Sequence, residues 1–451
     1  MPTLALSMIV KNAARDLLDC LASVNGIASE IVVADTGSTD DTPVIAERGG
    51  ARVISVPWEN DFAKARNVPL EMVTADWVVS LDADERLDAA AASVLPALMA
   101  RKEVDGYQVA IRNYVPTLAH KLWDRSAVPN DSTYAPARHA PAYVDHENVR
   151  LFRRDPQIRF TGRVHETVGW SILSSHRKLA TANLMIHHMG MLGDPEERAR
   201  KILFYLDLGK QKVAEMPDNR QAHFELGVSL LENLGNNRDA LVSFERACQI
   251  DPRFGLGWFF VGVCQFRLQD YPSALENLRR AERCGHSTPW LAEMLGDVHY
   301  NLGDFDAAAA CYRRSLKHAA AKASIESKLG LAEIRQGRDR AGLRRLREAV
   351  EAEPTDPDLH DRLIVAEVFL KHLPEAAGAA ERKLAATLPR AEDFLRAASI
   401  RGKMEQWQEA AALIRRGLAR HPNSEPLLNA LSKIETAARA TGTQFAEKVI
   451  S

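Results

Sequence analysis

The sequence lacks any apolar run close to the roughly 20 residues that a helix needs to span a bilayer. Residues 1–12 are mostly apolar, but no basic residue precedes the apolar run and no small-residue cleavage site follows it. We therefore expect them to form a strand rather than a signal peptide. Excess charge is also missing. The formal net charge is −2 over 451 residues, which argues against a nucleic-acid partner because such proteins usually carry a basic domain.

Cysteine is scarce and irregularly spaced. The chain has five cysteines, an odd number, and no CxxC pair. That pattern predicts neither a disulfide framework nor a cysteine-based zinc site. We expect reduced thiols packed in the core of a cytoplasmic protein. They are Cys20, Cys248, Cys264, Cys284 and Cys311.

The first 190 residues alternate short apolar runs with amphipathic stretches. The runs, at 4–10, 31–34, 53–56 and 77–81, are rich in valine and isoleucine and have the length of strands. Helix-like stretches lie between them. This alternation predicts a parallel sheet covered by helices, in which ligands bind at the carboxyl ends of the strands. The fold class expected for this part is therefore α/β.

From about residue 194 the sequence changes to alanine, leucine, arginine and glutamate and repeats itself. Small residues recur with a step of 34, as in the series Ala240, Ala274, Ala308 and the series Gly262, Gly296, Gly330. A period of about 34 residues is typical of tetratricopeptide repeats, whose helix hairpins bury their apolar faces by stacking. Phe244 and Tyr312 stand where a large side chain fills the hairpin.

The fold class expected for the whole chain is therefore α/β followed by all-α. We predict four segments from this change of pattern. They are a sheet domain over residues 1–190, a linking and capping helix over 194–217, an array of about six repeats over 218–435, and a tail over 436–451.

The strongest candidate site follows the apolar run 77–81. Asp82 and Asp84 are two residues apart, so in an extended backbone both side chains point to the same side. Paired carboxylates at a strand end suit Mg²⁺ or Mn²⁺, which complete their coordination with water and phosphate oxygens. The alternative interpretation is a solvated acidic turn.

Two further polar groups stand near the same predicted edge. Asp35 ends the second run, where a carboxylate can accept hydrogen bonds from a nucleoside. Arg66 lies in the stretch 61–67, and its planar guanidinium suits a diphosphate. A capped strand-to-helix turn and a surface arginine are the structural alternatives.

Four segments in order, LSMIVKN, EIVVADTGSTDDT, DFAKARN and ADWVVSLDADE, resemble the front half of family 2 glycosyltransferases. The resemblance is close over residues 4–88 and looser to about 190, where GRVHE and HHMG resemble the subgroup that carries tetratricopeptide repeats. It implies a GT-A fold and a nucleotide diphosphate sugar as donor. It also implies a divalent metal, held by the aspartate (DXD) motif.

Carried over to this sequence, the resemblance assigns roles to single residues. Asp35 and Arg66 would hold the nucleoside end of the donor, and Val10 and Asn12 would line the base pocket. Asp82 would lie against the ribose and diphosphate.

The metal site implied by the resemblance rests on Asp84 as ligand. His188 would be a third contact to the metal or diphosphate, although Met189 replaces the usual aromatic residue of that motif. Which of His187 and His188 matters stays open, and either is also consistent with a packed histidine.

An inverting transferase needs a base that takes the acceptor proton while the bond to the sugar forms. Glu166 is the candidate base and His165 the alternative, with a purely structural polar pair as the third interpretation.

The leading hypothesis is a metal-dependent, inverting glycosyltransferase of the hexosyltransferase kind that uses a UDP-sugar. The repeats would recruit a protein, peptide or glycan acceptor. They could also join copies of the chain into a homo-oligomer. A second hypothesis is a repeat scaffold with an inactive transferase domain. A nucleotidyltransferase would require a glycine-rich phosphate loop after the first strand, and residues 10–13, Val-Lys-Asn-Ala, do not form one.

Overall fold

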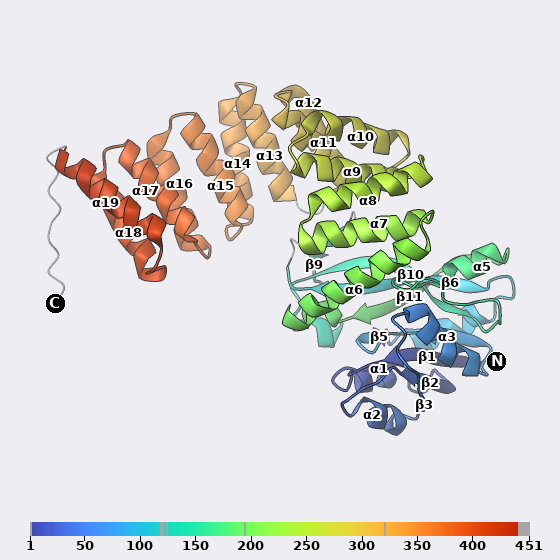
Figure 1. The fold of residues 1–451 in the computed structure, drawn as a ribbon. Helices are drawn as coiled ribbons and strands as arrows, with labels where there is room; N and C mark the ends of the chain where they lie inside the picture. The colour runs from blue at the N-terminus through green and yellow to red at the C-terminus, as the bar shows by residue number, and fades with distance from the viewer. Residues whose placement is uncertain (1, 118–120, 123–124, 194, 320–321, 441–451) are drawn as a thin grey trace, which may run out of the picture. The chain divides into compact units, whose positions relative to one another are not determined.

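The structure is a computed structural model that describes residues 2–117, 121–122, 125–193, 195–319 and 322–440. The chain divides into two compact units, Met1–Cys264 and Gln265–Ser451 (Figure 1). Among the described residues, no helix combines the length and apolar character needed to cross a membrane.

The N-terminal part begins with the predicted alternation of strands and helices. The elements are β1 (Leu4–Val10), α1 (Leu17–Ser23), β2 (Glu30–Asp35), α2 (Thr42–Arg48), β3 (Arg52–Ser55), α3 (Phe62–Met72) and β4 (Trp77–Ser80). Strands β3, β2, β1 and β4 lie side by side in that order, and each neighbouring pair is parallel. Their carboxyl ends therefore meet at one edge of the sheet, as predicted.

The rest of the sheet is not parallel throughout, which corrects the sequence-based expectation. The sheet continues in the order β4-β10-β6-β11-β5, and β10 is antiparallel to both β4 and β6. Strand β11 is parallel to β6 and antiparallel to β5. The remaining elements of this part are β5 (Glu85–Leu87), α4 (Ala91–Met99), β6 (Gly106–Val115), β7 (Lys121–Leu122), β8 (Arg125–Ser126), β9 (Val128–Pro129), β10 (Ala142–Arg153), α5 (Gly169–Ser174) and β11 (Leu179–His188).

The two faces of the sheet bury separate apolar clusters because side chains alternate along each strand. In β1, Leu4, Leu6 and Met8 pack with residues of α1, α2 and α4 on one face. Ala5 points the other way, into a cluster with residues of α3 and α5. The sheet is thus covered on both sides, which leaves its edge of strand ends for polar chemistry.

Helices follow from residue 195 to residue 440. Helix α6 (Pro195–Glu215) lies within the range predicted for the linking helix, whose first residue, 194, is outside the described residues. The helices after it are α7 (Arg220–Val228), continued by a π-helical turn (Ser229–Asn233), α8 (Asn237–Ile250), α9 (Gly255–Arg267), α10 (Tyr271–Arg283), α11 (Pro289–Asn301), α12 (Phe305–Leu316), α13 (Lys322–Arg335), α14 (Asp339–Ala352), α15 (Pro357–Phe369), α16 (Leu373–Ala386), α17 (Ala391–Lys403), α18 (Trp407–Arg420) and α19 (Glu425–Ala440).

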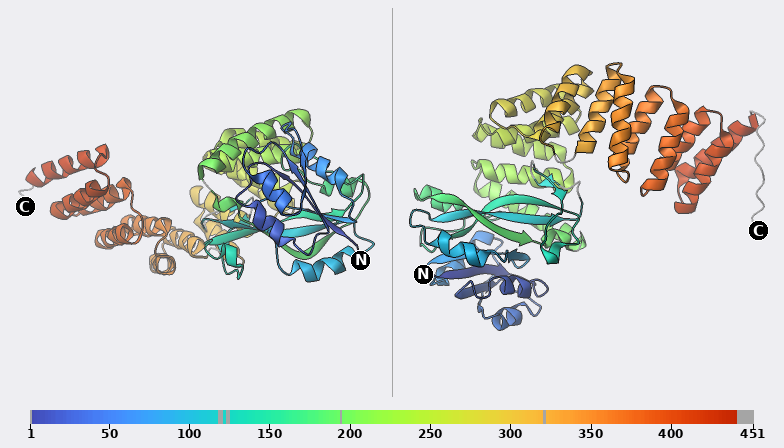
Figure 2. Two further views of the ribbon diagram at one scale, coloured as in Figure 1. Left: turned by 90° about the horizontal axis from the view of Figure 1, so that it is seen from below. Right: turned by 180° about the vertical axis from the view of Figure 1, so that it is seen from behind.

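Within each unit, consecutive helices pack as antiparallel hairpins, for example α7 with α8 and α11 with α12 (Figures 1 and 2). Small residues allow this close approach. A Cβ added to Gly227 would lie 2.7 Å from the Phe244 ring, and one added to Gly296 would lie 2.5 Å from the Tyr312 ring. Both aromatic residues are buried, so each glycine on one helix receives the large side chain of its partner helix.

Of the predicted tail, residues 436–440 continue α19 and residues 441–451 lie outside the described residues. All five cysteines are free. Cys20, Cys248 and Cys264 are buried, whereas Cys284 and Cys311 are half-buried.

Candidate functional site

The ends of β1 and β2 are joined by hydrogen bonds. The backbone amide of Asn12 donates to the Ser38 hydroxyl (2.9 Å), and the Asn12 side-chain oxygen accepts from the Thr39 amide (2.8 Å). The carboxylate of Asp35 accepts from the Ser38 amide. Val10 lies beside Asp35 in the strand register. Asn12, Asp35, Ser38 and Thr39 thus form one hydrogen-bonded group, the polar corner, and Val10 is the strand neighbour of Asp35.

Asp82 lies directly beyond this corner, after β4, between two arginines. Its carboxylate pairs with Arg66, from α3, and with the Nη2 atom of Arg150, from β10, at 3.3 Å. Burial alone would raise the pKa of Asp82, but the two guanidinium groups hold it well below the usual range of a carboxyl. Because 36% of the Asp82 side chain is exposed, this anion is open to solvent at the edge of the sheet.

Arg66 also pairs with Glu166, so it joins two carboxylates that are distant in sequence. Its side chain is only 7% exposed, and Glu166 is nearly as buried. The neighbouring His165 is exposed, and its backbone lies in the left-handed region with φ of 52°. Of the two candidate bases, Glu166 is therefore the one that belongs to the charged cluster.

Glu85 belongs to the same charged cluster and contacts both Asp82 and Arg150. One of its oxygens accepts from the Asp82 amide (2.9 Å), and the other pairs with Arg150 Nη2 (2.7 Å). Its burial raises its pKa to about 7 even though Arg150 opposes the shift. Glu85 therefore holds both the backbone of Asp82 and the arginine beside it.

The carboxylate of Asp84 lies 3.5 Å from Nε2 of His188. The pairing of β5 with β11 brings these residues together, because Glu85 stands opposite His188 in the register. The other ring nitrogen, Nδ1, lies 2.8 Å from the Asn113 side-chain oxygen, which fixes the ring with Nε2 toward Asp84. Burial opposes protonation of His188, but the hydrogen bond and charge of Asp84 prevail and raise its pKa to about 9.

Gly190 makes this approach possible. A Cβ at that position would lie 2.2 Å from Oδ2 of Asp84 and 2.8 Å from Nε2 of His188. No other residue type fits there without displacing the pair, so glycine lets the carboxylate and the imidazole lie close to the backbone of residue 190.

His187 has a different environment. Its Nδ1 lies 2.9 Å from the Tyr114 hydroxyl, its Nε2 lies 3.0 Å from Oδ2 of Asp88, and its ring stacks on Tyr134 at 3.7 Å. Burial lowers its pKa although Asp88 opposes the shift. Both ring nitrogens of His187 are thus engaged by other side chains, and His188 is the histidine that faces Asp84.

The residues around Asp84 fit a divalent cation of the Mg²⁺ or Mn²⁺ kind. Such ions accept one or two carboxylates and take their remaining ligands from water and phosphate. An oriented imidazole is also an acceptable ligand, particularly for Mn²⁺. Among the described residues, no group of three or more histidine, cysteine, aspartate or glutamate side chains is arranged to hold a metal. A cation held by Asp84 and His188 would therefore need oxygens from a bound phosphate compound.

Comparison with known protein families decides what kind of domain carries this cluster. Residues 6–159 match the profile described as Glycosyl transferase family 2. The sheet domain is a family 2 glycosyltransferase domain. Residues 293–357 match a tetratricopeptide repeat profile, so the helical part contains tetratricopeptide repeats. Both predictions of family are confirmed, and with them the fold class, α/β followed by all-α.

Curated relatives are named for one or the other of these two features. A TPR repeat-containing protein of Synechococcus elongatus is 34% identical over 39% of this chain and 37% of its own length. The prophage-derived glycosyltransferase SunS of Bacillus subtilis is 24% identical over 51% of this chain and 49% of its own. The lipopolysaccharide core biosynthesis glycosyltransferase LpsC of Rhizobium meliloti is 36% identical over 25% and 44%. The chain thus spans half or less of the length of each.

Among solved structures, a tetratricopeptide repeat protein of Parabacteroides merdae is similar to this chain. It is 14% identical, with a TM-score of 0.43, over 53% of this chain and 96% of that protein.

The glycosyltransferase domain brings the predicted site residues to one edge in two groups. Asn12 and Asp35 belong to the polar corner, and Val10 is the strand neighbour of Asp35. The charged cluster contains Arg66, Asp82 and Glu166, with Asp84 and His188 beside it. His165 is adjacent in sequence but makes none of these contacts.

Sequence reasoning missed three members of the cluster. Arg150 and Asn113 come from the long antiparallel strands β10 and β6, and no motif marks either. Glu85 stood within the quoted aspartate motif without a role. Its signal was its place directly after Asp84, and the structure puts it at the start of the short buried strand β5.

Proposed function

We propose that this protein is a metal-dependent, inverting glycosyltransferase that moves a hexose from a nucleotide diphosphate sugar, UDP-linked, to a protein, peptide or glycan. The observation that carries the proposal is the pair Asp84–His188 next to the arginine-bound Asp82, at the carboxyl edge of a family 2 domain. Ligands of parallel sheets bind at this edge.

The donor would lie along the edge from the polar corner to the charged cluster. Asp35 would accept hydrogen bonds from the nucleoside, whose base would rest against Val10 and Asn12. Asp82 would meet the ribose and diphosphate, while Asp84 and His188 would hold the cation. A bound Mg²⁺ or Mn²⁺ would neutralise the charge that builds on the leaving diphosphate.

Arg66 is engaged by Asp82 and Glu166, so its role in our proposal is to position these carboxylates. Glu166 would take the proton from the acceptor while the acceptor atom bonds to the anomeric carbon and the bond to the diphosphate oxygen breaks. Attack from the face opposite the leaving group inverts the anomeric centre.

A donor screen tests the proposal directly. Full-length protein is titrated with UDP-glucose, UDP-N-acetylglucosamine and GDP-mannose in a calorimeter, with and without MnCl₂, and slow donor hydrolysis is followed in parallel. We expect Mn²⁺-dependent binding of one donor. The absence of binding by all three, with and without Mn²⁺, would favour the repeat scaffold with an inactive domain.

The base assignment gives a sharper prediction. Glu166→Gln should bind the donor within about threefold of the wild type and lose transfer by at least about a hundredfold, because general-base catalysis typically contributes a factor of 10²–10⁴. Donor affinity is measured by calorimetry, and transfer by mass spectrometry of the acceptor. His165→Ala is the matched control. A normal transfer rate in Glu166→Gln, together with a loss in His165→Ala, would move the role to His165.

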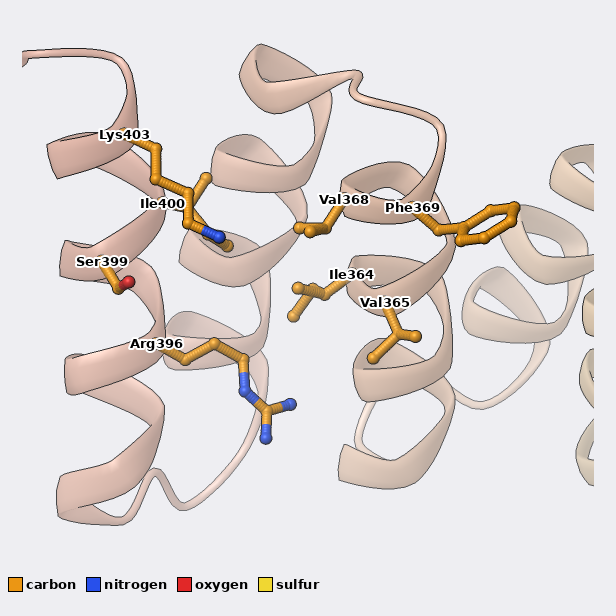
Figure 3. Close-up of a pocket in the computed structure, with 8 residues that line it drawn as sticks. All are labelled: Ile364, Val365, Val368, Phe369, Arg396, Ser399, Ile400 and Lys403. Carbon is orange, nitrogen blue, oxygen red and sulfur yellow. The ribbon is translucent and has the colours of Figure 1, made fainter.

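The repeats offer a surface for the acceptor. A cavity of about 400 Å³ lies between α15 and α17 (Figure 3). Val365 and Phe369 expose 54% and 56% of their surface there. The remaining lining residues are Ile364, Val368, Arg396, Ser399, Ile400 and Lys403. Of the two cations, Arg396 is already paired with Asp361. Uncovered apolar side chains beside Lys403 suit an apolar peptide segment that carries an acidic side chain.

Replacing both Val365 and Phe369 by serine should raise the KM for the acceptor about tenfold, since a few buried apolar anchors dominate such interfaces. Donor hydrolysis should not change, because neither residue belongs to the glycosyltransferase domain. Val242→Ser removes a valine of α8 that is also more than half exposed, and it is the control. Acceptor kinetics unaffected by the double substitution would place recruitment elsewhere.

A further inference from the structure

One face of helix α6 is attached to the glycosyltransferase domain. Tyr205, Leu208, Lys212 and Glu215 are spaced three, four and three residues apart, so they form one stripe along the helix. Leu208 is buried. The Lys212 ammonium donates to the Val164 carbonyl (2.7 Å). This stripe faces the segment that carries Glu166.

A second contact secures the same segment. Arg163 pairs with Glu215 and donates from Nη1 to the Asn60 carbonyl (2.7 Å). The Arg163 carbonyl in turn accepts from the amide of Phe62, the first residue of α3 (2.9 Å). Helix α6, residues 162–166 and the start of α3 are therefore one hydrogen-bonded assembly.

Tyr205 lies at the N-terminal end of the stripe and packs against Phe62 of α3. Its ring centroid is 5.7 Å from that of Phe62, and the neighbouring Phe204 packs near Trp58 at 6.2 Å. Phe62 precedes Arg66 by four residues, so both lie on the same side of α3. The aromatic contact thus holds Tyr205 beside the arginine that joins Asp82 and Glu166.

The Tyr205 hydroxyl is a hydrogen-bond donor whose acceptor is not among the described residues. Among the described residues, none forms a hydrogen bond with it, although the ring is packed. Burial raises its pKa to about 12, and the negative charges of Asp82, Glu166 and Asp84 contribute to that shift. The phenol is therefore protonated at neutral pH and lies within the field of the charged cluster.

We infer that α6 is a wall of the donor site and that Tyr205 donates its hydroxyl to a phosphate oxygen of the bound nucleoside diphosphate. The inference rests on the proposed function. A hydroxyl that donates to an anionic oxygen makes one of the stronger hydrogen bonds in proteins. The surrounding carboxylates cannot bind phosphate themselves without a cation, so a neutral donor at this place adds affinity without further charge.

Tyr205→Phe tests this because it removes only the hydroxyl and keeps the ring against Phe62. The full chain is titrated with UDP-glucose, UDP-N-acetylglucosamine and GDP-mannose in the presence of MnCl₂. For the donor that the wild type binds, we expect about a tenfold higher Kd in the variant, as for the loss of one hydrogen bond to a charged group. The melting temperature without ligand should not change.

Lys210→Ala, on an exposed position of α6, is the control and should leave both quantities at the wild-type value. Equal affinity of the wild type and Tyr205→Phe would overturn the inference and leave the proposed function intact. Weaker binding accompanied by a lower melting temperature would also overturn it, because the hydroxyl would then serve packing. If the wild type binds none of the three donors, the proposed function fails and this inference fails with it.

Discussion

Asp84→Asn is expected to lower donor turnover by at least about a hundredfold without unfolding the chain. The substitution keeps the shape of the side chain and removes the charge that would hold a divalent cation, and even indirect changes around a metal commonly cost a factor of 10–100. The ion-pair partner of Asp84 among the described residues is His188, and Asp84 is the main group that raises the pKa of this imidazole. In Asp84→Asn the imidazole can release its proton, so no buried cation is left unpaired.

The measurement is donor hydrolysis at saturating donor, with MnCl₂ and after chelation by EDTA. Chelated wild type should behave like the variant. Asp358→Asn removes an exposed carboxylate at the start of α15 and should have no effect. Full turnover of the Asp84→Asn protein in EDTA would rule out a metal role for this residue.

Arg66→Met should have the largest effect on stability. The guanidinium is buried between Asp82 and Glu166, so its removal leaves Glu166 without a cation and Asp82 with Arg150 alone. Breaking a buried ion pair by removing one partner typically costs about 3–5 kcal/mol. Native-state hydrogen exchange of β1 and β4 would report the free energy of unfolding of the sheet domain itself.

Two further variants show whether the loss of stability comes from the carboxylate of Glu166 that is left without a cation. Adding Glu166→Gln to Arg66→Met should recover part of the lost stability, because the uncompensated carboxylate is then gone. Arg101→Met, which removes an exposed arginine paired with Glu103, should change the unfolding free energy by less than about 1 kcal/mol. Equal losses for Arg66→Met and Arg101→Met would mean that the cluster contributes nothing to the stability of the fold.

Much of the site could be predicted because its residues follow parallel strands. The patterns around Asp35 and Asp82 are local, and the meeting of strand ends at one edge is a general property of such sheets. The repeats could also be predicted, because small residues such as Gly296 recur at a fixed period. The structure gives the reason for the small residue, since Gly296 lies against the Tyr312 ring.

The remaining members of the site depend on pairings that no local pattern records. Arg150 reaches Asp82 only because β10 runs antiparallel to β4, whereas the alternation at the start of the chain predicted a wholly parallel sheet. Asn113 supports His188 through the register of β6 with β11. Tyr205 is further away still, in a helix that the sequence indicated as a linker.

Lys212 has a consequence for how such proteins can be recombined. Its buried ammonium contacts both the Val164 carbonyl and, at 2.8 Å, the carboxylate of Glu225 in α7. The first repeat helix therefore supplies the counter-charge for a cation whose other partner belongs to the transferase. A chimera that exchanges repeat arrays at the end of the sheet, near residue 190, would inherit half of this contact. A junction beyond α7 would keep it whole, so the part of this chain that can be exchanged without dividing this contact begins after α7.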